Sequence, residues 1–183
     1  FQKAIDKAPD NEYLFPAYVN MGRTFTLLKR YNEAIEKFEL ASKIRQGNFD
    51  LNFDLYLNWS ISLAKSNRLD EAVKMVEKAS EINPKSLNLY LVWSSIYFES
   101  RRYNEAISRL EIADKLIPNG NKAKAIVYGG WGDVLVKLHR YDQAIEKYQM
   151  AVELDSENLI KEHQDNIHEI MVAGYHLLNL INE

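Results

Sequence analysis

Aromatic, small and apolar residues recur along this chain at steps of three and four positions. Four tyrosines open the pattern at intervals of 38, 34 and 38 residues: Tyr18, Tyr56, Tyr90 and Tyr128. A large apolar residue follows each tyrosine after three positions: Met21, Trp59, Trp93 and Trp131. The next position is always small: Gly22, Ser60, Ser94 and Gly132. Because these steps match the period of an amphipathic α-helix, the pattern predicts four helices of about three turns each.

A second apolar pattern follows each of these helices. Its alanines keep the same intervals: Ala34, Ala72, Ala106 and Ala144. The polar stretches between the two patterns, such as Lys29-Arg30 and His139-Arg140, are long enough only for a tight antiparallel reversal. Pairs of polar residues after each reversal are expected to cap and charge the first turn of the second helix: Asn32-Glu33, Asp70-Glu71, Asn104-Glu105 and Asp142-Gln143. No segment requires a β-strand.

The paired pattern resembles the tetratricopeptide repeat, a helix–turn–helix unit of about 34 residues. The resemblance covers four segments: 15–48, 53–86, 87–120 and 125–158. Residues 1–14 fit the second helix of a preceding, partial copy. The resemblance implies an all-α fold in which antiparallel helix pairs stack into a right-handed superhelix, as a single array over residues 1–183.

Three features depart from a regular array. Insertions at 49–52 and 121–124 should extend a helix by about one turn or add a loop. Residues 159–183 carry one apolar stripe and are expected to form a capping helix; the alternative is the start of a further repeat. The family's glycine between the two helices is replaced by other residues: Lys29, Asn67, Arg101 and His139. Lys and Arg tolerate a left-handed conformation less well than Asn and His, so the reversal is expected to differ in detail.

Composition narrows the classes of function. Hydrophobic residues make up 46% of the 183 residues, which argues against disorder. A formal net charge of −3 gives no reason to expect a nucleic acid as partner, and no apolar stretch is long enough for a membrane span. The absence of cysteine excludes disulfides and cysteine nucleophiles. Because the chain opens at Phe1 without an initiator Met, we expect a processed or excised piece. Its location stays open: the cytoplasm is favoured, and a signal upstream of Phe1 is the alternative.

No residue pattern predicts catalysis. Three of the four histidines, His163, His168 and His176, are spaced at steps of five and eight and form no metal-binding motif. Gly129-Gly130-Trp131-Gly132 lacks the spacing and the preceding strand of a phosphate-binding loop. Close helix packing explains Gly132, whereas Gly129 and Gly130 either admit a ligand backbone or merely loosen the helix. We therefore expect no enzyme activity, no catalytic residue, no cofactor and no metal.

The resemblance implies a binding surface instead. In tetratricopeptide arrays the first helices line a concave groove that binds ligands, usually peptides. By register, this predicted groove has the following lining: Asn20, Arg23, Leu57, Asn58, Ile61, Lys65, Leu91, Val92, Ser95, Phe98, Ile126, Gly130 and Asp133. The lining also includes Val19, Leu27 and Val136. The apolar members predict an exposed patch, which would mark a binding site. The alternative is a groove closed by tight curling, by the last helix or by another chain.

We expect the chain to be a scaffold that binds a protein or peptide in this groove. Some relatives hold a C-terminal carboxylate with a clamp of two Lys, two Asn and one Arg. The corresponding positions here agree only at Asn58: Val19, Arg23, Asn58, Asn88 and Val92. Carboxylate-clamp binding is therefore not expected. Two other functions stay open: self-association as a homo-oligomer, and service as the accessory region of a larger enzyme or of a secretion or envelope assembly.

Overall fold

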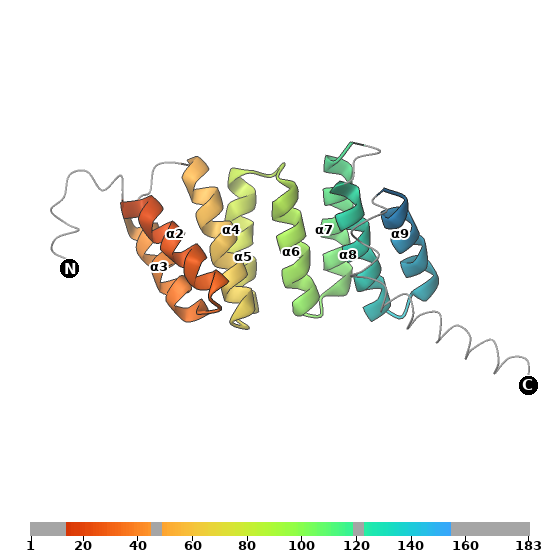
Figure 1. The fold of residues 1–183 in the computed structure, drawn as a ribbon, viewed down its shortest axis with the longest axis horizontal. Coiled ribbons are helices and arrows are strands. Elements are labelled where there is room, and N and C mark those ends of the chain that lie inside the picture. The colour runs from red at the N-terminus through yellow and green to blue at the C-terminus, as the bar shows by residue number, and fades with distance from the viewer. Residues whose placement is uncertain (1–13, 45–48, 119–122, 155–183) are drawn as a thin grey trace, which may run out of the picture. The chain divides into compact units, whose positions relative to one another are not determined.

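The computed structural model describes residues 14–44, 49–118 and 123–154, and all of its regular structure there is α-helical. Eight helices lie in these ranges (Figure 1): α2 (Leu14–Leu27), α3 (Tyr31–Ile44), α4 (Phe49–Lys65), α5 (Leu69–Ile82), α6 (Leu87–Glu99), α7 (Tyr103–Leu116), α8 (Ala123–Lys137) and α9 (Tyr141–Leu154). The all-α prediction is confirmed. The expected partial copy before residue 14 and the expected helix at 159–183 lie outside the described residues.

The first compact unit spans Phe1–Ser100 and contains α2 to α6. In it, α2 packs against α3 and α4 packs against α5 as antiparallel pairs, and α4 also contacts α2, α3 and α6 (Figure 1). One core cluster joins α2, α3 and α4: Phe15, Val19, Ala34, Phe38, Ala41 and Leu55. The large apolar positions of the sequence pattern thus fill the space between helices, while the alanines allow their backbones to approach.

The second compact unit spans Arg101–Glu183 and contains α7, α8 and α9. Here α8 and α9 form the antiparallel pair, and α7 packs against α8. Two clusters of buried residues hold α8 to α9, one around Tyr128 and Ala151 and the other around Leu135 and Tyr148. Each unit therefore has its own buried residues.

Four short connections between consecutive helices share one backbone conformation in the described part of the chain. Lys29, Asn67, Arg101 and His139 all have a positive φ, between 57° and 63°. At the first reversal, the amide of Arg30 donates to the carbonyl of Phe25 at 2.9 Å, and that of Lys29 to Thr26 at 3.0 Å. This is the helix ending that normally has glycine at the left-handed position. The expectation that Lys and Arg would change the reversal is therefore wrong: the backbone keeps the left-handed turn.

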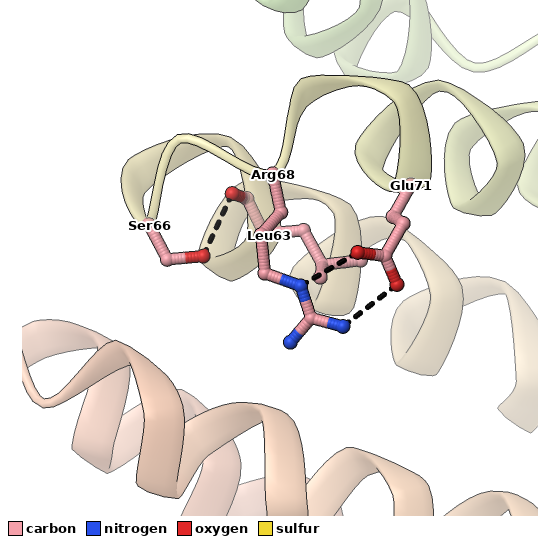
Figure 2. A network of polar contacts seen from close by, with 4 residues as sticks. All are labelled: Leu63, Ser66, Arg68 and Glu71. Carbon is pink, nitrogen blue, oxygen red and sulfur yellow. Dashed lines mark hydrogen bonds and ion pairs between the residues drawn. The ribbon is translucent and has the colours of Figure 1, made fainter.

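The second helices start one residue before the predicted caps. α5 begins at Leu69, so the flanking residue is Arg68, which makes no side-chain capping hydrogen bond. Instead, Nε and Nη2 of Arg68 donate to the two carboxylate oxygens of Glu71, each at 2.7 Å (Figure 2). Arg30 makes the same two contacts with Glu33, and Arg102 donates from Nε to Oε1 of Glu105 at 2.9 Å. The prediction that four polar residues cap these helices is wrong, because they already lie in the first helical turn: Asn32, Asp70, Asn104 and Asp142. The predicted acidic charge in the first turn of each second helix is confirmed.

Two glycines mark close approaches between paired helices. A Cβ added to Gly22 would lie 2.5 Å from Cε1 of Phe38, and one added to Gly132 would overlap the ring of Tyr148. By contrast, a Cβ on Gly130 would meet only Leu110 Cδ2, at 3.8 Å. The insertion at 49–52 forms the first turn of α4, which is why that helix has 17 residues.

Candidate functional site

The first helices of the first unit, α2, α4 and α6, carry most of the predicted groove. Their polar members are accessible: Asn20, Arg23, Lys65 and Ser95 are exposed. Asn58 and the larger apolar members are half-buried: Asn58, Ile61, Leu91, Val92 and Phe98. This combination gives a surface with polar groups in solvent and aliphatic side chains partly accessible between them.

Two residues of the predicted groove are in the core rather than on the surface. Leu57 is 3% exposed, and its neighbour in the predicted lining, Val19, is 7% exposed. The reason is the position of α4, which contacts all four other helices of the unit and keeps only a narrow strip accessible. The prediction of a strongly exposed apolar patch is therefore wrong at Leu57 and too strong at the half-buried positions.

Some polar groove residues already have partners within the protein. Lys65 Nζ lies 2.8 Å from Glu99 Oε1, and this ion pair joins α4 to α6. Asn58 Nδ2 donates to the carbonyl of Asp54 one turn earlier, at 2.7 Å. The Oδ1 atom of Asn58 accepts no hydrogen bond from the described residues, so it remains available to a ligand.

The second unit carries the remaining predicted residues on α8. Ile126 is 58% exposed. Gly130 and Asp133 are half-buried. Asp133 Oδ1 accepts a hydrogen bond from the hydroxyl of Tyr148 on α9, at 2.7 Å. Asp133 therefore has a structural contact, which its place in the sequence register did not reveal.

The charged groups with shifted pKa values stabilise helix ends and junctions. Hydrogen bonds from Arg68 hold the pKa of Glu71 below its usual value, and Arg30 and Arg102 have the same effect on Glu33 and Glu105. These ion pairs could have been predicted from the sequence, because an Arg three residues before a Glu recurs at the repeat interval. All three pairs are exposed, and they lie at the reversals rather than in the predicted groove.

A further ion pair at the start of α8 was missed by the sequence analysis. Lys124 Nζ lies 2.8 Å from Asp114 Oδ1, and the Lys124 side chain is only 8% exposed. Burial raises the pKa of Asp114, but hydrogen bonding by Lys124 and Tyr128 outweighs it and leaves the pKa below its usual value. The pair joins α7 to α8. Because both side chains are largely covered, we assign the pair a structural role rather than a binding role.

One open hollow of about 390 Å³ lies outside the predicted groove. It is formed by the first reversal and the end of α4: Lys29, Arg30, Tyr31, Asn32, Glu33 and Ser66. Within the described ranges, no three His, Asp or Glu side chains converge as metal ligands. None of the helices described has the length and apolar content needed to cross a bilayer.

Comparison with known proteins agrees with this geometry. The family model of the tetratricopeptide repeat matches residues 15–48 and 53–86, which include α3, α5 and most of α2 and α4. The chain therefore contains two tetratricopeptide repeats, over residues 15–48 and 53–86. Its fold is shared by PilF of Pseudomonas aeruginosa, at a TM-score of 0.67 and 15% identity over 90% of this chain and 78% of that chain. No curated protein sequence matches it.

Two further solved structures share the tetratricopeptide fold. YrrB, described as having an unusual peptide-binding site, has a TM-score of 0.66 and 19% identity over 83% of this chain and 74% of that chain. MamA from Desulfovibrio magneticus RS-1 has a TM-score of 0.65 and 19% identity, over 81% of this chain and 77% of that chain. At these identities the likeness shows the fold, and the surface chemistry of this repeat protein must be taken from its own residues.

Proposed function

We propose that this repeat protein is a passive scaffold that binds an extended segment of a partner protein on α2, α4 and α6. The observation that carries the proposal is the accessible strip on these helices. It combines exposed groups of Asn20, Arg23 and Ser95 with half-buried aliphatic side chains of Ile61 and Leu91. Ile126 and Gly130 are proposed to serve in the same way on α8.

The chemistry of the strip suits an extended peptide. Amide side chains hydrogen-bond a peptide backbone, and aliphatic side chains between them select the peptide's own side chains. Lys65 and Glu99 neutralise each other, so this pair is proposed to border the strip rather than to bind. The binding mode is not a carboxylate clamp, because apolar Val19 and Val92 occupy two of the clamp positions and Val19 is buried.

A blocking substitution tests this proposal without disturbing the core. Ser95 is exposed in the middle of α6, so Ser95→Trp should cover the strip and leave the helices intact. Peptides are first selected from a displayed random library on the wild-type chain and then synthesised. We expect their affinity, measured by calorimetry, to fall at least about tenfold in Ser95→Trp.

The matched control is Ser108→Trp, which adds the same bulk to an exposed position of α7. It should leave the affinity unchanged, and circular dichroism should show native helicity in both variants. Equal affinity for Ser95→Trp and the wild type would contradict binding on this surface.

A second candidate function is self-association. Its supporting observation is the exposure of Met21 and Leu28, at 43% and 59%, at the first unit's α2 and the residue after it. Light scattering over a range of concentrations should then show a mass that rises from one chain toward two, and Leu28→Glu should prevent the rise. A constant mass of one chain would exclude this candidate.

A further inference from the structure

Three residues form an accessible stripe on α2. Asn20, Arg23 and Leu27 are all exposed and follow one another at steps of three and four, so they share one face of the helix. We call them the α2 stripe. Leu27 is 84% exposed, more than any other large hydrophobic residue in the described part of the chain. An amide, a cation and an exposed leucine therefore follow one another along one face of α2.

The cation of this stripe forms no ion pair with the described residues. α2, α4 and α6 carry two basic residues, Arg23 and Lys65. Lys65 is paired with Glu99 at 2.8 Å. Arg23 makes no ion pair with any residue that the structure describes, and it is exposed. The positive charge of Arg23 is thus the one on these three helices that a ligand can neutralise.

The α2 stripe lies beside Ile61, the half-buried aliphatic residue of the predicted groove on α4. Thr26 Oγ1 and Ser62 Oγ are hydrogen-bonded at 2.6 Å, so these residues are level on the two parallel helices. Counting back three residues along each helix places Arg23 level with the stretch from Asn58 to Ile61. A peptide that crosses from α2 to α4 can therefore contact Arg23 and Ile61 together.

We infer that the α2 stripe reads one acidic side chain, flanked by aliphatic side chains, in an extended peptide of the partner. The carboxylate pairs with the guanidinium of Arg23, and the adjoining aliphatic side chains cover Leu27 and Ile61. Asn20 and the Oδ1 atom of Asn58 bind the peptide backbone. The inference rests on the proposed function, because it requires a peptide on this surface.

Charge complementarity supports this occupant. The planar guanidinium group binds a carboxylate through two parallel hydrogen bonds, which gives direction as well as attraction. A second acidic residue of the peptide is disfavoured further along α4, because the exposed carboxylate of Asp54 would repel it. Asp54 lies about 7–8 Å along the helix axis from the level of Arg23. Asp54 also has no ion-pair partner among the described residues. The sequence recognised is therefore one Asp or Glu among aliphatic residues rather than an acidic run.

The test compares peptide selections on three forms of the full chain. A displayed library of random dodecapeptides is selected on the wild type, on Arg23→Glu and on Lys74→Glu, in which the same charge is reversed at an exposed position of α5. We expect one Asp or Glu beside aliphatic residues on the wild type and on Lys74→Glu, and Lys or Arg in its place on Arg23→Glu. In the synthetic wild-type peptide, replacing the acid by its amide should weaken binding about tenfold, but should change little on Arg23→Gln.

The outcomes separate this inference from the proposed function. Selected peptides without an acid, whose binding Ser95→Trp still prevents, would overturn the inference and leave the proposed function standing. Binding that neither Ser95→Trp nor Arg23→Glu affects would overturn both. Association of the chain with itself that is lost in Arg23→Glu, seen by light scattering, would identify a second copy as the occupant and also overturn the inference.

Discussion

Four non-glycine residues hold the left-handed conformation at the reversals, and each does so at a cost. For an L-residue this conformation is unfavourable by about 1–2 kcal/mol, because Cβ approaches the following carbonyl oxygen. Lys29 has φ 59° and an exposed side chain, so its side chain gives no compensating burial. We expect Lys29→Gly to raise the free energy of unfolding by about 0.5–1 kcal/mol, measured by urea denaturation.

The same change elsewhere supplies the controls. Lys74 is exposed within α5, where glycine should lower the free energy of unfolding by about 1 kcal/mol. Asn67→Gly should stabilise less than Lys29→Gly, because asparagine tolerates the left-handed region. A higher free energy of unfolding in Lys29→Gly together with a lower one in Lys74→Gly would support the conformational account. Destabilisation by Lys29→Gly would contradict it.

The small residue after each aromatic position was predictable as a close approach, but its partner was not. Gly22 faces the ring of Phe38 and Gly132 that of Tyr148, 16 residues later in both cases. At the same register in the second repeat, Ser60 corresponds to Val76. Glycine thus occurs with an aromatic ring and serine with a smaller side chain. This complementarity depends on which side chain the fold brings across, and helical periodicity alone does not reveal it.

At the scale of helices, the sequence predicted the elements well and their ends less well. The period of three and four is a local property, and short polar stretches leave room only for a reversal. The first residue of each second helix is aromatic or leucine, such as Tyr31 or Leu69, and the pattern did not show whether it lies inside the helix. In the structure this aromatic residue or leucine is the first residue of the helix. The polar residue after it therefore lies in the first turn, and Arg30 and Arg68 directly precede α3 and α5.

The junction between α7 and α8 should make stability depend on pH through Asp114 and Lys124. Burial raises the pKa of Asp114, but hydrogen bonding by Lys124 and Tyr128 together with the charges of Lys124 and Lys147 outweighs it and holds the pKa below its ordinary value of 3.8. The stabilisation is therefore complete above that ordinary value and lost as the pH falls through the lowered pKa. Hydrogen bonding to Asp114 raises the pKa of Lys124 above 10.5, so its contribution is complete below 10.5 and lost as the pH rises through the raised value.

Removing the carboxylate tests this junction. Asp114→Asn leaves the largely buried ammonium of Lys124 without its counter-ion, so the free energy of unfolding at neutral pH should fall by about 1–3 kcal/mol. The variant should also lose part of the acid-side decrease in stability, seen as a flatter profile below pH 4. Identical profiles for the variant and the wild type would show that Asp114 does not contribute.

At the scale of the whole molecule, exposure was the property that the sequence predicted least. Leu57 and Ile61 are one helical turn apart, and the register placed both on the groove. Leu57 is buried and Ile61 is half-buried, because several helices close on α4 from different sides. The number of neighbours around a helix is a result of the whole stack, so a pattern read along one helix cannot supply it. The α2 stripe could be predicted from the sequence, because α2 contacts fewer of the described helices than α4 does.

The distribution of buried residues over separate clusters predicts graded rather than uniform stability. In repeat proteins each helix pair depends mainly on its nearest neighbours. Gly22→Ala places a Cβ 2.5 Å from Phe38 Cε1 and should strain the contact between α2 and α3. In this variant, hydrogen exchange should show that the amides of α2 and α3 lose more protection than those of α6. The control is Gly130→Ala, whose Cβ would meet only Leu110; it should leave the protection of α2, α3 and α6 unchanged. Equal losses in α2, α3 and α6 would mean that the first unit opens as one cooperative body, and the nearest-neighbour account would then be wrong.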